Sequence, residues 1–194
     1  MSGSEVVDPN EVFLEWQRIL KPKHRKVRHF LPKKLKEAYI KGRYLEDATA
    51  NVLKRNNTHF IREQFVQYRN IRGQVDFIVV DGASHIVETK YTKSGEFKDL
   101  WFIQTMIYSL GTKINDIVFL YGNDAGFRTS RIVFNPKIAK AFAKELITML
   151  KPYKHISAGT LIGYHKFTKS NVSLSVIRKM LNERLKSGLI IFSS

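Results

Sequence analysis

Three charged residues interrupt two apolar, β-branched segments of this 194-residue chain. Asp76 lies within the run VDFIVV, and Glu88 and Lys90 lie within HIVETKY. A carboxylate inside such a segment is costly to bury unless it pairs with a cation or binds a metal. Two carboxylates on adjacent strands would also repel each other. A divalent cation would relieve that repulsion, and carboxylate oxygens are hard ligands that suit Mg²⁺ or Mn²⁺.

The length of the turn between the two segments decides whether these side chains converge. Side chains alternate along a strand, so Glu88 and Lys90 share one face. A three-residue loop at residues 81–83 would place Asp76 opposite Glu88, whereas a two-residue turn would place it opposite Thr89 and on the other face. We therefore predict the odd-length loop, or a bulge that has the same effect.

A solvated sheet face that carries one ion pair and a spare acid is the ordinary alternative. It fits the three charged residues poorly, because Ile78, Val80 and Ile86 would occupy the same face and are apolar. The combined pattern therefore favours a metal site over a surface ion pair.

The surrounding sequence predicts the elements that would position this hairpin. Apolar spacing near 3.6 residues indicates helices, and alternating β-branched runs indicate strands. In chain order these are helices over 8–20 and 34–55, strands over 58–68, 71–80 and 84–91, a helix over 97–110 that ends at Gly111, strands over 115–121 and 127–134, and a helix over 136–150, followed by a helix over 173–186 and a strand over 189–192. This order predicts an α/β (α+β) fold in which helices flank a mixed central sheet. Tyr39 and Glu46 fall on or beside the apolar stripe of the second helix.

Together with two flanking elements, these residues resemble the signature of the PD-(D/E)XK nuclease superfamily. That signature is an acid followed on the next strand by E-x-K, as in Asp76 and then Glu88-Thr89-Lys90. Upstream, GRYLE, which ends at Glu46, is similar to the first-helix G-x-x-x-E element of the superfamily. Downstream, QTMIY, which runs from Gln104 to Tyr108, is similar to the Q-x-x-x-Y element of its RecB-like branch.

The resemblance implies a restriction-endonuclease-like core of order α-β-β-β-α-β and the activity of a Mg²⁺- or Mn²⁺-dependent deoxyribonuclease. On this basis the metal ligands would be Asp76, Glu88, the Thr89 carbonyl and Glu46. Lys90 would orient or deprotonate the attacking water, or neutralise transition-state charge, and Gln104 and Tyr108 would bind the DNA backbone or brace Lys90. Action on single-stranded or free-ended DNA is expected from the branch. The chain has no cysteine, so the iron–sulfur cluster of the CRISPR-adaptation relatives is not carried over.

Each flanking element also has an ordinary structural interpretation. Glu46 taken alone would be a common helix acid. Gln104 and Tyr108 are four residues apart and share a helix face, so Tyr108 could belong to the core and Gln104 could be a capping amide.

The charge balance points to a polyanionic partner. The 33 lysines and arginines against 17 acids give a net charge of +16, and such a domain usually meets nucleic acid or an anionic membrane surface. Basic residues concentrate in the segments 21–43 and 151–194, each of which contains one acid. These flanks would be either solvated surface or arms that hold DNA phosphates, and the second case predicts steep salt dependence. The basic residues assigned to DNA contact are Lys33, Lys34, Lys41 and Arg43.

The composition suggests three regions along the chain. They are a basic N-terminal helix and arm over 1–33, a nuclease core over 34–150 and a basic C-terminal extension over 151–194. No apolar run is long enough to span a bilayer, which excludes a membrane-spanning protein. Of the two polyanions, we expect DNA rather than a membrane as the partner. The resemblance implies a cytoplasmic protein of a prokaryotic cell or of one of its viruses.

Two other functions stay open at this point. A structure-selective endonuclease such as a Holliday-junction resolvase could use the same core, normally as a symmetric homodimer. A non-catalytic DNA-binding protein is the other alternative, because the C-terminal helix, Gly188 and the short final strand faintly suggest a winged helix. Incubation of DNA with Mg²⁺ or Mn²⁺, with and without EDTA, separates the enzymes from the binding protein.

Overall fold

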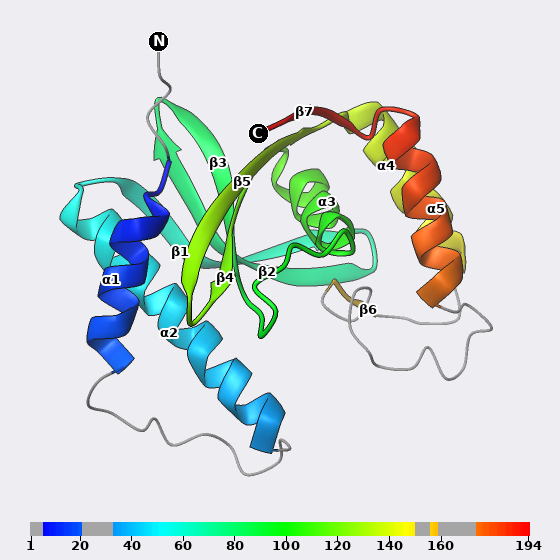
Figure 1. Cartoon of the computed structure of the whole chain (residues 1–194). Coiled ribbons are helices and arrows are strands. Elements are labelled where there is room, and N and C mark those ends of the chain that lie inside the picture. The colour runs from blue at the N-terminus through cyan, green and yellow to red at the C-terminus, as the bar shows by residue number, and fades with distance from the viewer. Residues whose placement is uncertain (1–5, 21–32, 150–155, 159–173) are drawn as a thin grey trace. The chain divides into compact units, whose positions relative to one another are not determined.

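The chain folds into helices and strands in a mixed α/β arrangement (Figure 1). The computed structural model describes residues 6–20, 33–149, 156–158 and 174–194. Its elements are α1 (Pro9–Leu20), α2 (Lys33–Arg55), β1 (His59–Tyr68), β2 (Ile71–Asp81), β3 (Ala83–Tyr91), α3 (Trp101–Thr112), β4 (Asp116–Asn123), β5 (Gly126–Phe134), α4 (Pro136–Met149), β6 (Ile156–Ser157), α5 (Leu174–Lys186) and β7 (Ile190–Ser193). The predicted fold class and the order α-β-β-β-α-β, from α2 to β4, are confirmed.

The strands form one mixed sheet of seven strands in the order β1-β2-β3-β4-β5-β7, with β6 paired to β2. The β2–β3 and β5–β7 pairs are antiparallel, and the β2–β6 pair is parallel. Strand β6 was not predicted, because two residues are too few to show a periodic pattern. None of the helices in the described part of the chain is both long and apolar enough to cross a lipid bilayer.

Tertiary contacts divide the chain into two compact units. The first unit comprises Met1–Arg62, Asp76–Phe97 and Val118–Ser130, and the second comprises Glu63–Val75, Lys98–Ile117 and Arg131–Ser194. The first unit therefore contains the β2–β3 hairpin from Asp76 onward, together with α1 and α2.

The hairpin has the register that the odd-length loop requires. Val80 pairs with Ser84, and the ladder continues to Phe77 opposite Val87. Gly82 sits at the tip with φ of 69°, a left-handed conformation that costs glycine little. The prediction of an odd-length loop is confirmed, and Asp76 and Glu88 are the next residues beyond this ladder.

Helix α1 packs against α2 and fixes its position in the first unit. Asp8 caps α1, because its Oδ1 accepts a hydrogen bond from the backbone N–H of Asn10 at 2.8 Å. Val12 and Trp16 are buried, and the Trp16 indole N–H donates to the carbonyl of Lys41 at 3.1 Å. This bond ties α1 to the turn of α2 that comes just before Glu46.

The buried face of α2 begins later than its apolar pattern suggests. Tyr39 was predicted to lie on this face, but it is 55% exposed. Among its described side chains, Ile40 is partly buried against the core, and the fully buried residues begin at Tyr44 and Leu45.

Helix α3 differs from its prediction at both ends. It begins at Trp101 rather than at residue 97, and Gly111 lies inside it rather than terminating it. A Cβ atom on Gly111 would lie 2.2 Å from a methyl carbon of Val66, so this glycine permits close packing. The helix ends instead at Thr112, and the following residue Lys113 caps it with φ of 65° while its N–H donates to the carbonyl of Ser109 at 2.8 Å.

A buried carboxylate on α1 stabilises the α1–α2 contact. Arg18 donates from Nε and Nη2 to the two oxygens of Glu15 at 2.9 and 2.7 Å, and Asn51 of α2 donates to the same carboxylate at 2.8 Å. The hydrogen bonds from Arg18 and, secondarily, from Asn51 lower the pKa of Glu15 to about 2, although burial acts in the opposite direction.

We expect Glu15→Gln to remove a pH-dependent part of the folding free energy. The pKa of Glu15 is lower in the folded chain than the ordinary value of 4.5. Its contribution, about 3 kcal/mol for this shift, is therefore present above pH 4.5 and is lost as the pH falls toward 2. Urea unfolding between pH 7 and pH 2.5 should show a shallower pH dependence for the variant. An exposed control, Glu96→Gln, should follow the wild type, and equal slopes for Glu15→Gln and the wild type would contradict the assignment.

Candidate active site

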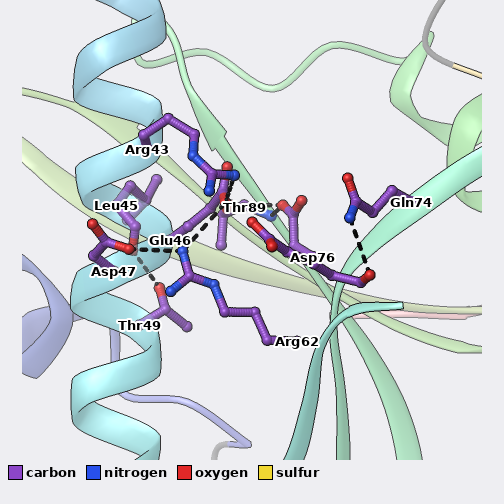
Figure 2. A network of polar contacts seen from close by, with 10 residues as sticks. Arg43, Leu45, Glu46, Asp47, Thr49, Arg62, Gln74, Asp76 and Thr89 are labelled. Carbon is purple, nitrogen blue, oxygen red and sulfur yellow. Dashed lines mark hydrogen bonds and ion pairs between the residues drawn. The ribbon is translucent and has the colours of Figure 1, made fainter. Parts of the chain in front are cut away.

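The hairpin brings Asp76 and Thr89 into direct contact (Figure 2). One oxygen of Asp76, Oδ2, accepts hydrogen bonds from the backbone N–H of Thr89 at 2.8 Å and from its hydroxyl at 2.7 Å. Both bonds go to the same oxygen, so the carboxylate is held in one orientation. Metal ligation by the Thr89 carbonyl stays a prediction, and the amide and hydroxyl have the separate task of orienting Asp76.

Glu88 is a buried carboxylate with only half of its hydrogen-bonding capacity used. Its side chain is 2% exposed, and Oε1 accepts a hydrogen bond from Lys90 Nζ at 2.6 Å. Oε2 is buried and has no hydrogen-bond partner among the described residues. A buried, unsatisfied carboxylate oxygen is expensive, so this atom calls for a partner that the described residues do not supply.

The surroundings of Glu88 disfavour its ionised form. Burial is the largest cause, and the negative charges of Asp76 and Glu46 add to it, so the pKa of Glu88 rises to about 8 despite the opposing effect of Lys90. A cation placed beside Glu88 and Asp76 would reverse this effect, because it would favour the charged form of both carboxylates.

Lys90 remains positively charged in this setting. Its side chain is 19% exposed. Burial alone would lower the pKa of Lys90, but the charges of Glu88 and Asp76 and the hydrogen bond to Glu88 outweigh burial and raise it. Lys90 is therefore an ammonium ion at neutral pH and faces the carboxylates as a hydrogen-bond donor.

Helix α2 contributes Glu46 to the same cluster. The Glu46 side chain is 14% exposed, and its charge raises the pKa values of both Glu88 and Lys90. Figure 2 shows Arg43 and Arg62 next to it. Arg43 donates to Glu46 Oε2 at 2.5 Å, and Arg62 Nη2 lies 3.5 Å from the same oxygen. Glu46 therefore faces the hairpin carboxylates and the two arginines rather than open solvent.

Arg62 and Asp47 belong to this cluster, although the sequence did not reveal them. Arg62 Nη2 donates to Asp47 Oδ1 at 2.7 Å. In the sequence, Arg62 occupies an ordinary polar position of an alternating strand, and Asp47 is one more acid on a helix. Arg43 was assigned to DNA contact, and the structure places its guanidinium on Glu46.

The residues present fit a magnesium-type site with few protein ligands. No group of three or more His, Cys, Asp or Glu side chains stands close enough to hold a metal in the described ranges. Mg²⁺ does not require such a cage, because it keeps several waters and commonly uses one or two carboxylates together with substrate phosphate. Asp76 and Glu88 would supply those two carboxylates, and Glu88 Oε2 is an acceptor for which the described residues provide no donor.

Lys41, assigned to DNA contact, takes part in a network on the surface of the first unit. Its ammonium lies 2.6 Å from Asp124 Oδ2 and 3.2 Å from Glu37, and it lies 5.5 Å from the centre of the Tyr91 ring. Burial opposes the charged form, but the hydrogen bonds to Asp124 and Glu37 outweigh burial and raise the pKa of Lys41. DNA contact by Lys41 would have to compete with these partners.

Large parts of the predicted basic arms lie outside the described residues. Segments 21–32 and 159–173 belong to that part of the chain. Lys33 and Lys34 begin α2, but their side chains are likewise outside the described set. Their assignment to DNA contact stays a prediction.

Gln104 and Tyr108 form a buried pair on α3, in the second unit. Gln104 Nε2 donates to the Tyr108 hydroxyl at 2.8 Å, and the two residues are 8% and 2% exposed. The Tyr108 ring lies against Gly73 so closely that a Cβ there would be 2.3 Å from Cε1. The pair therefore contributes to packing within its unit, and its role toward DNA or Lys90 stays a prediction.

Comparison of the chain with family models, with curated proteins and with solved structures gives no match. The function must therefore be inferred from the chemistry of the site.

We expect removal of a negative and of a positive neighbour to shift the pKa of Glu88 in opposite directions. Asp76→Asn removes a repelling charge, so the pKa of Glu88 should fall below its value of about 8. Lys90→Met removes an attracting charge, so the pKa should rise. Carboxyl ¹³C NMR titration of the metal-free protein measures both, with exposed Asp99→Asn as the control. A wild-type midpoint near the ordinary value of 4.5 would contradict the burial argument.

Proposed function

We propose that this chain is a divalent-metal-dependent DNA nuclease that hydrolyses phosphodiester bonds. The observation that carries the proposal is Glu88, a buried carboxylate beside Asp76 with one oxygen that no described residue satisfies. Carboxylates of this kind are retained where they hold a cation, and Mg²⁺ or Mn²⁺ is the expected occupant.

Asp76 and Glu88 would hold the metal, and Glu46 would complete the site directly or through water. A bound divalent cation of this kind lowers the pKa of a coordinated water and stabilises charge on a phosphate. Thr89 would keep Asp76 in its orientation through the two hydrogen bonds to Oδ2.

Lys90 would act as a cation rather than as a base. Its pKa is raised by the neighbouring carboxylates, so at neutral pH it carries a proton and cannot accept another. It can orient the attacking water by donating a hydrogen bond, and it can neutralise charge that develops on the phosphate oxygens. Among the three roles considered for Lys90, deprotonation of the water is the one that this arrangement disfavours.

Membership of the PD-(D/E)XK superfamily is part of the proposal. It is supported by the order of elements from α2 to β4, by the hairpin register, after whose last pair Asp76 and Glu88 follow, and by the effect of Glu46 on Glu88. The RecB-like branch, with single-stranded or free-ended DNA as substrate, rests on Gln104 and Tyr108 as a sequence element. The net charge of +16 supports DNA binding through the backbone with little sequence preference.

We expect wild-type protein to cut labelled oligonucleotides in Mg²⁺ or Mn²⁺ and EDTA to stop the reaction. Asp76→Asn and Glu88→Gln should each lower the cleavage rate by about 100-fold or more, because each removes a metal ligand. Lys90→Ala should abolish cleavage while DNA affinity stays within about threefold of the wild type, because most affinity comes from backbone contacts elsewhere. Gel assays and fluorescence anisotropy measure the two properties.

Glu96→Gln, an exposed acid of the first unit, is the matched control and should cut as the wild type does. Loss of DNA binding in parallel with activity in Lys90→Ala would assign that lysine a structural role. Wild-type protein that binds DNA tightly but never cuts it in either metal would refute the nuclease and favour a non-catalytic DNA-binding protein.

A further inference from the structure

Arg62 has an arrangement that its ion pairs do not explain. Its Nη2 atom contacts Asp47 at 2.7 Å and Glu46 at 3.5 Å, and its guanidinium lies 5.8 Å from the centre of the Phe77 ring. Figure 2 shows the guanidinium between the acids of α2 and Asp76. The Nε atom is buried and has no hydrogen-bond acceptor among the described residues.

Two other arginines of the chain show what a structural ion pair looks like here. Arg18 uses Nε and Nη2 together on the two oxygens of Glu15, and Arg131 does the same on Asp116. This two-pronged geometry matches a carboxylate or a phosphate. Arg62 has the same pair of donors, but toward the acids of the described residues it uses Nη2, and Nε has no acceptor among them.

The backbone next to Arg62 is also unusual. Glu63 has φ of 58° in the middle of β1, a left-handed conformation that a non-glycine residue rarely adopts within a strand. The side-chain amide of Gln74 donates to the Glu63 carbonyl at 3.1 Å. Such backbone irregularities in strands re-aim neighbouring side chains and occur often beside active sites.

The charges of the cluster leave room for one anion once a metal is present. Four acids (Glu46, Asp47, Asp76 and Glu88) face three cations (Arg43, Arg62 and Lys90), which sums to −1 at ordinary charges. A divalent cation would bring the sum to +1, and a phosphodiester carries −1. Arg43 and Lys90 each have a carboxylate at 2.5 or 2.6 Å. Of the three, Arg62 is the cation with a buried N–H for which the described residues offer no acceptor.

We propose that Arg62 is a substrate-binding residue whose Nε–H donates to a non-bridging oxygen of a DNA phosphodiester while Nη2 stays on Asp47. Asp47 and the Phe77 ring hold the guanidinium, so Asp47 is a positioning residue that acts through Arg62. This inference rests on the proposed nuclease function, since it assigns the group that receives the phosphate of that same site.

The test compares Arg62→Ala and Arg62→Lys with the wild type in the oligonucleotide cleavage assay in Mn²⁺. Loss of a charge-assisted hydrogen bond to phosphate should lower the cleavage rate of Arg62→Ala by about 10- to 100-fold. Arg62→Lys should also lose about 10-fold, because lysine keeps the charge but not the planar pair of donors. Arg128→Ala, at an exposed arginine of the same unit, is the control and should stay within about twofold.

Chemical rescue separates a phosphate contact from a structural role. Methylguanidinium added to Arg62→Ala should restore cleavage several-fold, whereas methylammonium at the same concentration should not. DNA affinity of Arg62→Ala in EDTA should weaken by about 3- to 10-fold. Thermal unfolding checks that each variant is folded. If Arg62→Ala does not fold, the cleavage rate of Arg62→Lys, which keeps a cation beside Asp47, tests the role of Arg62.

The outcomes separate a failure of the Arg62 assignment from a failure of the proposed nuclease function. Wild-type cleavage together with undiminished cleavage by Arg62→Ala and Arg62→Lys would overturn the role of Arg62 and leave the nuclease intact. Equal rescue by both added cations would also overturn it, because simple charge would then suffice. Wild-type protein that never cuts in any metal would overturn the nuclease and the role of Arg62 with it.

Discussion

The burial of the Glu88 carboxylate is the constraint on which the first unit depends. The Glu88 side chain is 2% exposed, so its ionised form must be compensated, and among the described residues only the ammonium of Lys90 bonds to it. Asp76 and Glu46 add like charge rather than relieving it. The cluster is therefore under electrostatic strain that protonation of Glu88 reduces and that a bound cation would reduce further. A packed apolar residue would be cheaper at this position unless the charge has a task.

The elements around the hairpin can be understood as the means of holding this strained cluster. Trp16 fixes the turn of α2 that comes before Glu46, and the Glu15 network anchors α1 to the same helix. Thr89 fixes Asp76 from the neighbouring strand. Arg43 and Arg62 offset the charge of the α2 acids. The acids therefore come from different elements, yet each is oriented by a partner within the first unit.

Much of the scaffold could be predicted from sequence because it follows from periodicity. Alternation along two strands and the length of one turn predicted the register of the hairpin that carries Asp76 and Glu88. The observed pairing of Val80 with Ser84 confirms that register. Glycine was harder to interpret, because Gly111 serves close packing against Val66 rather than helix termination. Its role depends on a neighbour far away in sequence.

The parts of the site that the sequence did not predict are those that depend on three-dimensional contact alone. Arg62 follows the ordinary alternation of β1, and only its position between α2 and Phe77 distinguishes it. Thr89 was expected to act through its carbonyl, and the hydrogen bonds from its amide and hydroxyl to Asp76 were not foreseeable from residue spacing. Lys41 and Arg43 were assigned from the local density of positive charge, which carries no information about the acids of other elements that reach them.

A crystal structure of the protein soaked in Mn²⁺, read by anomalous scattering at the manganese edge, tests the central claim most directly. We predict an anomalous peak within bonding distance of Glu88 Oε2 and of Asp76. A fully loaded crystal with no peak there, and with Glu88 Oε2 still buried and without a ligand, would contradict the account.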